Sequence, residues 1–192
     1  MMYTVSKKVI IVAADHTDEG GRHKDAIVDY LKRIGRTVIE LEHESKDDSY
    51  VKIAGVAAHM AKGHHGKEGT PDSAVLIDKY GTGMSSISNS FLGVIASVVW
   101  GPNMAREVTR KNNPRIICIP TYTEEREKGI VEISPEYAVE IVKAWINTEF
   151  LEGIPEEEQS KYIERERENL RIHLGSIKDI IGNFDFLEKI TP

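Results

Sequence analysis

Five short runs of apolar residues alternate along the chain with amphipathic stretches, and this pattern predicts the strands of one sheet. The first run, Val9 to Ala14, is continuous and β-branched, which is typical of a strand buried on both faces of a parallel sheet. The second run, Thr37 to Leu41, alternates between apolar and polar positions. The remaining runs lie at residues 74–77, 94–100 and 115–119.

The stretches between these runs predict helices. Ile27, Tyr30, Leu31 and Ile34 recur at helical spacing, and Gly35 is a natural C-terminal stop. Further helices are predicted to open at Asp47 and Asp48 and end at Gly63, to start over 84–89, to cover 104–111, and to run from Ser134 and Pro135 to Ile146. Because strands and helices alternate throughout, the predicted fold class is α/β, with a mostly parallel sheet that carries helices on both faces.

The composition changes at Leu151, which divides the predicted domains into 1–150 and 151–192. Pro155 opens a charged helix. Apolar residues then recur at alternating spacings of four and three, interrupted at Arg167; they are Ile163, Leu170, Leu174, Ile177, Ile181 and Phe184. Such a seam requires a partner helix, and Gly175 and Gly182 favour a bent arm over a long coiled coil. The arm either exchanges with a second subunit or folds back on its own core.

Composition and charge narrow the class of protein. The net charge of -6, without a basic run interleaved with aromatic residues, predicts no nucleic-acid partner. The single Cys118 excludes an internal disulfide and suits a reducing cytosol, and its place in an apolar strand predicts a buried core residue. The run at 9–14 is too short for a signal peptide or a membrane span, so we expect a cytoplasmic protein with no membrane partner.

A glycine turn follows the third predicted strand. Gly81 and Gly83 flank Thr82 and allow a tight turn that points successive amides at one spot, and the helix that starts after it turns its positive end to the same spot. This arrangement predicts an anion-binding cradle. The alternative is an ordinary turn between a strand and a helix.

Asp15 and His16 end the first predicted strand, and ligands of open α/β sheets bind beyond the carboxyl ends of the strands. The pair is therefore a candidate ligand contact, although a helix cap with a solvent-facing histidine is an equal alternative. His59, His64 and His65 suggest no metal site, because no carboxylate stands at ligand spacing and glycines surround the last two.

Several short motifs carry a resemblance when they are taken together. They are Ala14-Asp15-His16, the Gly-Thr-Gly turn with a Ser- and Asn-containing helix start, Asn112-Asn113 before the fifth strand, and Trp145 to Phe150. Over roughly residues 9–150 the chain resembles the ribose-5-phosphate isomerase B family, which includes the two subunits of galactose-6-phosphate isomerase. The resemblance implies a Rossmann-like three-layer α/β/α sandwich with a five-stranded sheet, and dimers in which each active site uses residues of both subunits.

The resemblance also implies a reaction, the interconversion of aldose and ketose phosphates through an enediol, with no metal or organic cofactor. Asp15 and His16 would contact the sugar and assist ring opening or phosphate binding, while Thr82 and the amides around it would hold the oxyanion. The implied substrate-binding residues are Gly81, Gly83, Met84, Ser85, Asn89, Trp100, Asn103, Arg106 and Arg110.

The usual base of this family has no counterpart in the chain. Tyr80 stands immediately before the glycine turn, where many members have a catalytic cysteine, and a phenol with an ordinary pKa of about 10 is a poor base at neutral pH. Asp78, two residues earlier on the same predicted strand and face, or Asp15 at the same sheet edge, is the candidate replacement.

The phosphate clamp of the family is also missing beyond the last core helix, where Leu151 to Ile154 stands instead. Arg106 or Arg110 would then bind the phosphate, unless a tail arginine of a second subunit, among Arg165, Arg167 and Arg171, reaches over.

Three functions remain open on the sequence. The first is an aldose-ketose isomerase of a phosphorylated pentose or hexose, working as a homodimer or tetramer. The second is a catalytically incomplete subunit that completes a site with a cysteine-bearing paralogous subunit. The third is a module that binds a sugar phosphate without converting it.

Overall fold

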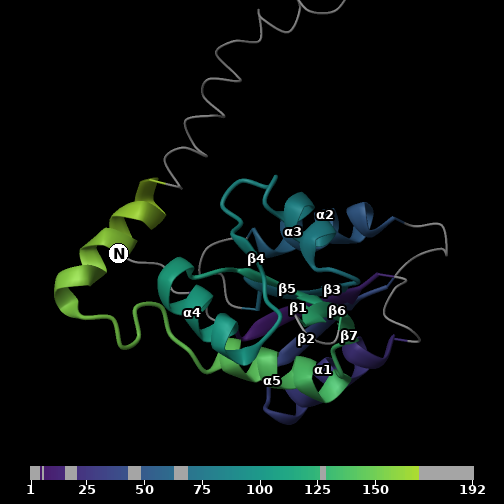
Figure 1. Cartoon of the computed structure of the whole chain (residues 1–192). Helices are drawn as coiled ribbons and strands as arrows, with labels where there is room; N and C mark the ends of the chain where they lie inside the picture. The colour runs from purple at the N-terminus through teal and green to yellow at the C-terminus, as the bar shows by residue number, and fades with distance from the viewer. Residues whose placement is uncertain are drawn as a thin grey trace, which may run out of the picture. The chain divides into compact units, whose positions relative to one another are not determined.

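Figure 1 shows a computed structural model of the chain. The structure describes residue 5 and residues 7–15, 21–42, 49–62, 69–125 and 129–168, without side chains over 123–131. The backbone divides into two compact units, residues 1–153 and 154–192. The first unit holds the whole sheet and all the labelled helices.

A five-stranded parallel sheet forms the centre of the first unit, as the alternation of strands and helices predicts (Figure 1). Its strands are β1 (Val9–Ala14), β2 (Thr37–Leu41), β3 (Ser73–Asp78), β4 (Ala96–Val98) and β5 (Ile116–Pro120). They lie in the order β2-β1-β3-β5-β4, and each hydrogen-bonded pair is parallel. The α/β fold class is therefore confirmed.

Helices cover both faces of the sheet and bury its alternate side chains. On one face, Ile10, Val12 and Ile77 pack in a cluster with α1 (Arg22–Arg33), α4 (Pro102–Asn112) and α5 (Pro135–Ile146). On the other, Ile11 and Leu76 pack with α2 (Tyr50–Ala61) and α3 (Thr82–Ser88), and we call this the α2/α3 face. The continuous apolar runs follow from this burial on both sides, because neither face of β1 or β3 meets water.

The helix ends confirm some of the predicted caps and correct others. Ser134 caps α5 by accepting a hydrogen bond from the amide of Tyr137, as predicted. Helix α2 is capped by Ser49 and begins at Tyr50, so it does not open at Asp47 and Asp48, which lie outside the described residues. Helix α3 begins at Thr82 rather than Met84.

Two elements differ from the expected strands. Strand β4 covers only Ala96–Val98, although the apolar run extends over 94–100. An antiparallel hairpin that the sequence analysis did not predict, β6 (Tyr122–Glu125) and β7 (Gly129–Glu132), follows β5 as a separate two-stranded sheet. Its strands are short and rich in glutamate, which is why the apolar pattern did not indicate them.

The second unit contains a helix over 156–168, which agrees with the charged helix predicted after Pro155. Within it, the Gln159 side chain donates to the carbonyl oxygen of Ile154. The seam from Leu170 to Phe184, with both of its glycines, lies outside the described residues, so arm exchange stays a prediction. No helix in the described ranges is both long enough and apolar enough to span a membrane.

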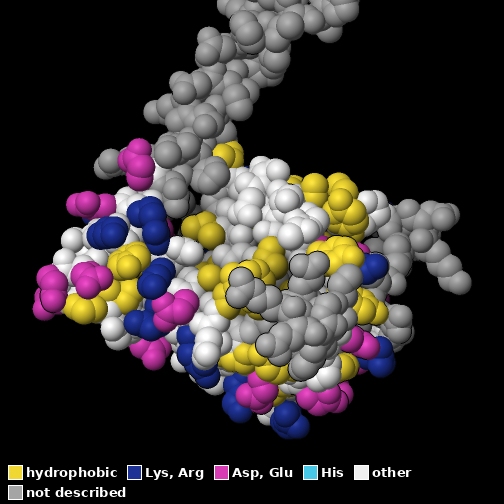
Figure 2. All heavy atoms as spheres, viewed as in Figure 1, with side chains coloured by type: hydrophobic (Ala, Val, Ile, Leu, Met, Phe, Trp, Pro, Cys, Tyr) yellow, Lys and Arg dark blue, Asp and Glu magenta, His cyan; other side chains and the backbone are white. Residues whose placement is uncertain are grey.

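Charges of both signs are mixed on the visible surface. On the face seen in Figure 2, Lys and Arg side chains lie beside Asp and Glu side chains, and no broad patch of positive charge is visible.

Candidate active site

Two carboxylates lie side by side where β1 and β3 end. These strands are neighbours, with Ala14 opposite Ile77, and the Asp15 amide donates to the Ile77 carbonyl oxygen at 2.9 Å. Asp78 is the last residue of β3 and is 5% exposed. The alternation along both strands directs the two side chains to the α2/α3 face. The structure thus brings together the two predicted acids, while His16 lies outside the described residues.

The Asp78 carboxylate is held by the glycine turn that follows it. Its Oδ1 atom accepts hydrogen bonds from the amides of Tyr80, at 3.0 Å, and Gly81, and its Oδ2 atom accepts one from Met84 at 3.0 Å. The predicted anion cradle therefore exists, but its first anion is the carboxylate of its own strand. In the described chain, the first-turn amides of Thr82 and Gly83 have no protein acceptor.

The surroundings of Asp78 pull its pKa in opposite directions. Burial raises the pKa most, and the negative charge of Asp15 adds to this rise. The amides of Met84, Gly81 and Tyr80 lower it because they stabilise the ionised carboxylate. The net result is a pKa above the ordinary value of 3.8, which brings this carboxylate closer to the basicity that a proton transfer at neutral pH requires.

Both glycines of the turn are needed for close packing. Gly81 has φ +73°, and a Cβ atom there would lie 2.8 Å from Cγ1 of Val98. A Cβ atom at Gly83 would lie 2.9 Å from the ring of Tyr50, the first residue of α2. Tyr50 therefore closes the turn from the neighbouring helix. Tyr50 is not among the predicted site residues, because its position depends on how α2 docks beside α3, which the sequence does not indicate.

Tyr80 does not share a strand or face with Asp78, so that prediction is wrong. Strand β3 ends at Asp78, and the hydrogen bond from the Tyr80 amide to the Asp78 side chain begins the turn. The Tyr80 side chain is 52% exposed. It therefore lies at the carboxyl edge of the sheet with its ring open to solvent.

The side chains of three predicted substrate-binding residues make contacts within the fold. The Asn89 side chain exchanges two hydrogen bonds with the backbone of Ala96, each at 2.9 Å, and so fastens α3 to β4. The Ser85 hydroxyl donates to the same carbonyl oxygen at 3.4 Å. The Met84 side chain is fully buried in the core of the α2/α3 face. Substrate binding at these three positions stays a prediction.

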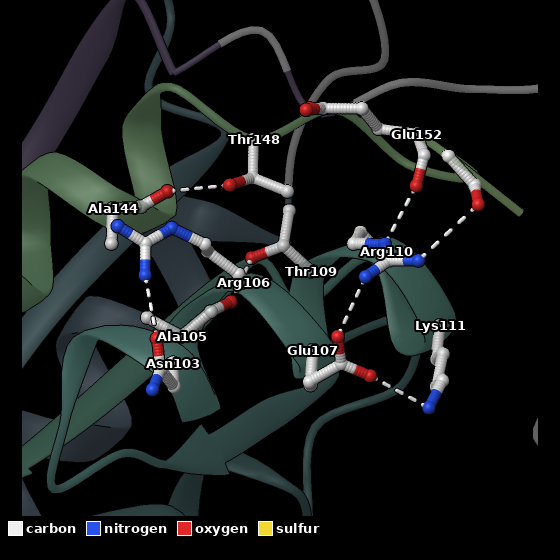
Figure 3. A network of polar contacts seen from close by, with 11 residues as sticks. Asn103, Ala105, Arg106, Glu107, Thr109, Arg110, Lys111, Ala144, Thr148 and Glu152 are labelled. Carbon is white, nitrogen blue, oxygen red and sulfur yellow. Dashed lines mark hydrogen bonds and ion pairs between the residues drawn. The ribbon is translucent and has the colours of Figure 1, made fainter.

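Figure 3 shows where the predicted arginines lie. Arg110 donates to the carbonyl oxygens of Glu152 at 2.6 Å and Gly153 at 3.5 Å, and to the Glu107 carboxylate at 2.7 Å. Helix α4 runs back from the carboxyl end of β4 to the start of β5, so its last turn lies at the opposite edge of the sheet. Within this chain Arg110 therefore lies at the edge opposite Asp15 and Asp78, and its part in phosphate binding stays a prediction.

The first part of α4 stays near the carboxyl edge. Arg106 donates to the Asn103 side chain at 2.8 Å, which ties together two of the predicted contacts. Trp100, just after β4, is 52% exposed, and a Cβ atom at Gly101 would lie 3.3 Å from the Tyr137 hydroxyl. Trp100, Asn103 and Arg106 thus remain candidates at the rim of the site.

Cys118 is fully buried in β5, as predicted for a core residue. Burial raises the pKa of its thiol well above the ordinary value, and the nearby Asp78 charge raises it further. The thiol is therefore protonated at neutral pH and cannot replace the missing cysteine base. Among the residues that the structure describes, no cluster of three potential metal ligands is found.

Comparison with known proteins shows the family to which the chain belongs. Residues 10–163 match the family described as Ribose/Galactose Isomerase, which is most of the chain. The chain belongs to this ribose/galactose isomerase family. The resemblance drawn from the short motifs is confirmed, and the match covers the sheet, both carboxylates and the glycine turn.

Relatives of the chain are sugar-phosphate isomerases. D-erythrulose-4-phosphate isomerase of Pectobacterium atrosepticum is 27% identical over 150 residues, which cover 76% of this chain and 90% of that protein. Among solved structures, ribose-5-phosphate isomerase B from Mycoplasma genitalium with bound ribulose-5-phosphate has a TM-score of 0.68 at 21% identity. The match covers 85% of this chain and 95% of that one.

The enzyme of the same name from Clostridium thermocellum also has a TM-score of 0.68, at 24% identity, with 88% of this chain and 99% of that one covered. At these identities the two structures establish the fold shared with the ribose/galactose isomerase family. The chain is thus a member of a family of sugar-phosphate isomerases with the Rossmann-like α/β sheet.

Proposed function

We propose that the chain is an aldose-ketose isomerase of a phosphorylated sugar, which moves a proton between C1 and C2 through an enediol. The observation that carries this proposal is the pair of carboxylates, Asp15 and Asp78, at adjacent strand ends beside the glycine turn. A base and an oxyanion-binding site are the two parts that enolisation requires, and this edge of the sheet offers both.

Asp78 is the proposed base. A carboxylate has about four lone-pair sites, and the three amides occupy only three of them. One site remains on Oδ2, the oxygen that would lie 3.4 Å from a Cβ atom at Gly83. The raised pKa of Asp78 supports this role, and Asp15 supports it by adding negative charge nearby. The amides of Thr82 and Gly83 would hold the oxyanion of the enediolate.

The substrate is proposed to be a phosphorylated sugar of four to six carbons. D-erythrulose 4-phosphate is the first candidate, because a relative of 27% identity carries that substrate in its name. Ribulose 5-phosphate is the second, because it is bound in a structure of the same fold. The proposed reaction needs no cofactor, and the proposed assembly is a homodimer or a tetramer.

Solvent deuterium exchange tests this function directly. The purified chain is incubated in D₂O with a panel of aldose and ketose phosphates, and proton NMR follows loss of signal at C1 and C2. We expect the wild type to catalyse deuterium exchange in one sugar phosphate. Asp78→Asn should catalyse no exchange, and Asp15→Asn should catalyse slower exchange. Full exchange by Asp78→Asn, checked at a temperature where the variant is folded, would remove Asp78 as the base.

One observation favours a second candidate, a subunit that is incomplete on its own. Three amides already hold the Asp78 carboxylate, which restrains it as a structural acceptor. A chain of this kind would bind a sugar phosphate but exchange deuterium only when a cysteine-bearing paralogous subunit is added. Exchange by the purified chain alone would exclude this candidate.

A further inference from the structure

Lys79 lies directly after Asp78, and its amine is placed between two tyrosine rings. The Nζ atom is 5.4 Å from the centroid of the Tyr80 ring and 5.7 Å from that of the Tyr122 ring. Both separations are within the range of a cation-π interaction. Among the side chains that the structure describes, Lys79 has no acidic partner.

Backbone hydrogen bonds fix this arrangement at the carboxyl edge of the sheet. The amide of Thr121 donates to the Asp78 carbonyl oxygen at 2.9 Å, and the amide of Tyr122 donates to the Lys79 carbonyl oxygen at 3.1 Å. The start of β6 is therefore attached to the turn that follows β3. As a result, Lys79, the residue directly after the proposed base, lies with its amine against rings from the turn and from β6.

Other described cations near this edge are already engaged. Arg22, at the start of α1, forms an ion pair with Glu132 at 2.9 Å, and Arg106 donates to Asn103 after β4, two strands away from β3. Arg110 is bound at the opposite edge. Tyrosine rings attract an ammonium group without occupying its N–H donors in the way that a carboxylate does, so Lys79 keeps donors for an anion.

An anionic substrate needs such a cation here. The chain carries a net charge of -6, and Asp15 and Asp78 place two acidic groups at the site itself. A sugar phosphate would approach this edge against that charge unless a cation offsets it. We propose that Lys79 binds the phosphate group of the substrate and is the phosphate-binding residue of this chain. The proposal rests on the proposed function and assigns its phosphate contact.

The test compares Lys79→Met with Lys143→Met. Lys143 is an exposed lysine of α5 that pairs with Glu140, so its variant removes the same charge away from the site. For the sugar phosphate that exchanges deuterium, we expect Lys79→Met to raise KM roughly 10- to 100-fold with little change in kcat. Lys79→Arg should recover most of the affinity, and Lys143→Met should behave as the wild type.

A merely structural role for Lys79 predicts a different result. Loss of the cation-π contacts alone would lower the midpoint of thermal unfolding and leave KM unchanged. If Lys79→Met keeps the wild-type KM in an active enzyme, the phosphate assignment is overturned while the proposed function stands.

Binding of inorganic phosphate tests the assignment of Lys79 independently of isomerase activity. If the wild type converts no sugar, the wild type and Lys79→Met are each titrated with inorganic phosphate, and binding is followed by ³¹P NMR. Binding by the wild type that is lost in Lys79→Met would support the anion site even though the isomerase proposal had failed. Equal binding by both proteins, or binding by neither, would overturn it.

Discussion

At the scale of single residues, the Asp78 carboxylate has to satisfy both the fold and the proposed chemistry. Three amides depend on it as their acceptor, and its remaining lone pair is the one available to a substrate. From the sequence, the carboxylate and the glycine turn were each predicted. That the carboxylate accepts from the amides of the turn depends on how the chain bends after β3, and the apolar pattern does not indicate this bend.

The first prediction concerns the stability of the turn. In Asp78→Asn, the side-chain amide replaces one carboxylate oxygen and cannot accept from the amides as the carboxylate does. We expect the free energy of unfolding to fall by about 1 to 3 kcal/mol in urea titrations. Asp29→Asn, at an exposed position of α1, is the matched control and should change it by less than about 0.5 kcal/mol. Equal stability of the two variants would contradict the capping role.

Gly81 supports a second prediction at this scale. In Gly81→Ala, the new Cβ atom would have both a φ of +73° and a contact of 2.8 Å with Val98. The two effects together should cost about 2 to 4 kcal/mol of unfolding free energy. Gly35→Ala shares the positive φ of +77° but has nothing within 4 Å, so it should cost only about 1 to 2 kcal/mol. Similar losses in both variants would show that the contact with Val98 relaxes freely.

At the scale of elements, the sequence predicted a helix end where the residues that form the cap are close in sequence. Ser134 and Pro135 mark the start of α5, and the cap is formed by atoms three residues apart. The hairpin of β6 and β7 gave no such signal, because its strands are only four residues long and three of their eight residues are glutamates. Helix α4 was predicted over 104–111 but begins at Pro102 and ends at Asn112. The sequence also did not predict that Arg110 would bind the carbonyl oxygens of Glu152 and Gly153.

The cap of α5 gives a prediction for an element. Ser134→Ala removes the hydrogen bond to the Tyr137 amide and should lower the unfolding free energy by about 1 kcal/mol. Ser86→Ala is a suitable control, because its exposed hydroxyl donates to the Thr82 carbonyl oxygen within α3 and caps no helix. Chemical denaturation of the two variants measures the difference. If Ser134→Ala has the wild-type free energy of unfolding, water replaces the hydrogen bond of the cap.

At the scale of the whole molecule, the sheet could be predicted because its strands are buried on both faces. The pairing of β1 with β3 then follows from the order of the strands, and it brings Asp15 and Asp78 together. The walls of the site could not be predicted in this way. Tyr50 of α2 lies against Gly83, and Tyr122 of β6 lies beside the Lys79 amine; both positions depend on how those elements dock against the sheet.

Lys7 links the two ends of the first unit and makes global stability depend on pH. Its Nζ atom donates to the carbonyl oxygens of Trp145 at 2.6 Å and Thr148 at 3.1 Å, at the C-terminal end of α5. Burial lowers its pKa from 10.5 to about 8, chiefly because the charged amine loses water, and nearby acids such as Asp72 only partly oppose this.

The sign of the effect follows from proton binding. Between about pH 8 and 10.5 the folded protein has lost the Lys7 proton while the unfolded chain still holds it. The unfolded state therefore binds more protons, so this residue makes stability rise with pH, by about 3 kcal/mol over the whole window. Below pH 8 both states are protonated and the cost of burying the charge is constant.

Comparison with Lys7→Met isolates this contribution, because the other lysines and the tyrosines titrate in both proteins. Urea titrations at a series of pH values between about 7.5 and 10 should give a more positive slope of unfolding free energy against pH for the wild type. Parallel curves would mean that the buried amine keeps its proton in the folded protein. In that case the carbonyl oxygens at the end of α5 stabilise the ammonium form enough to offset its burial.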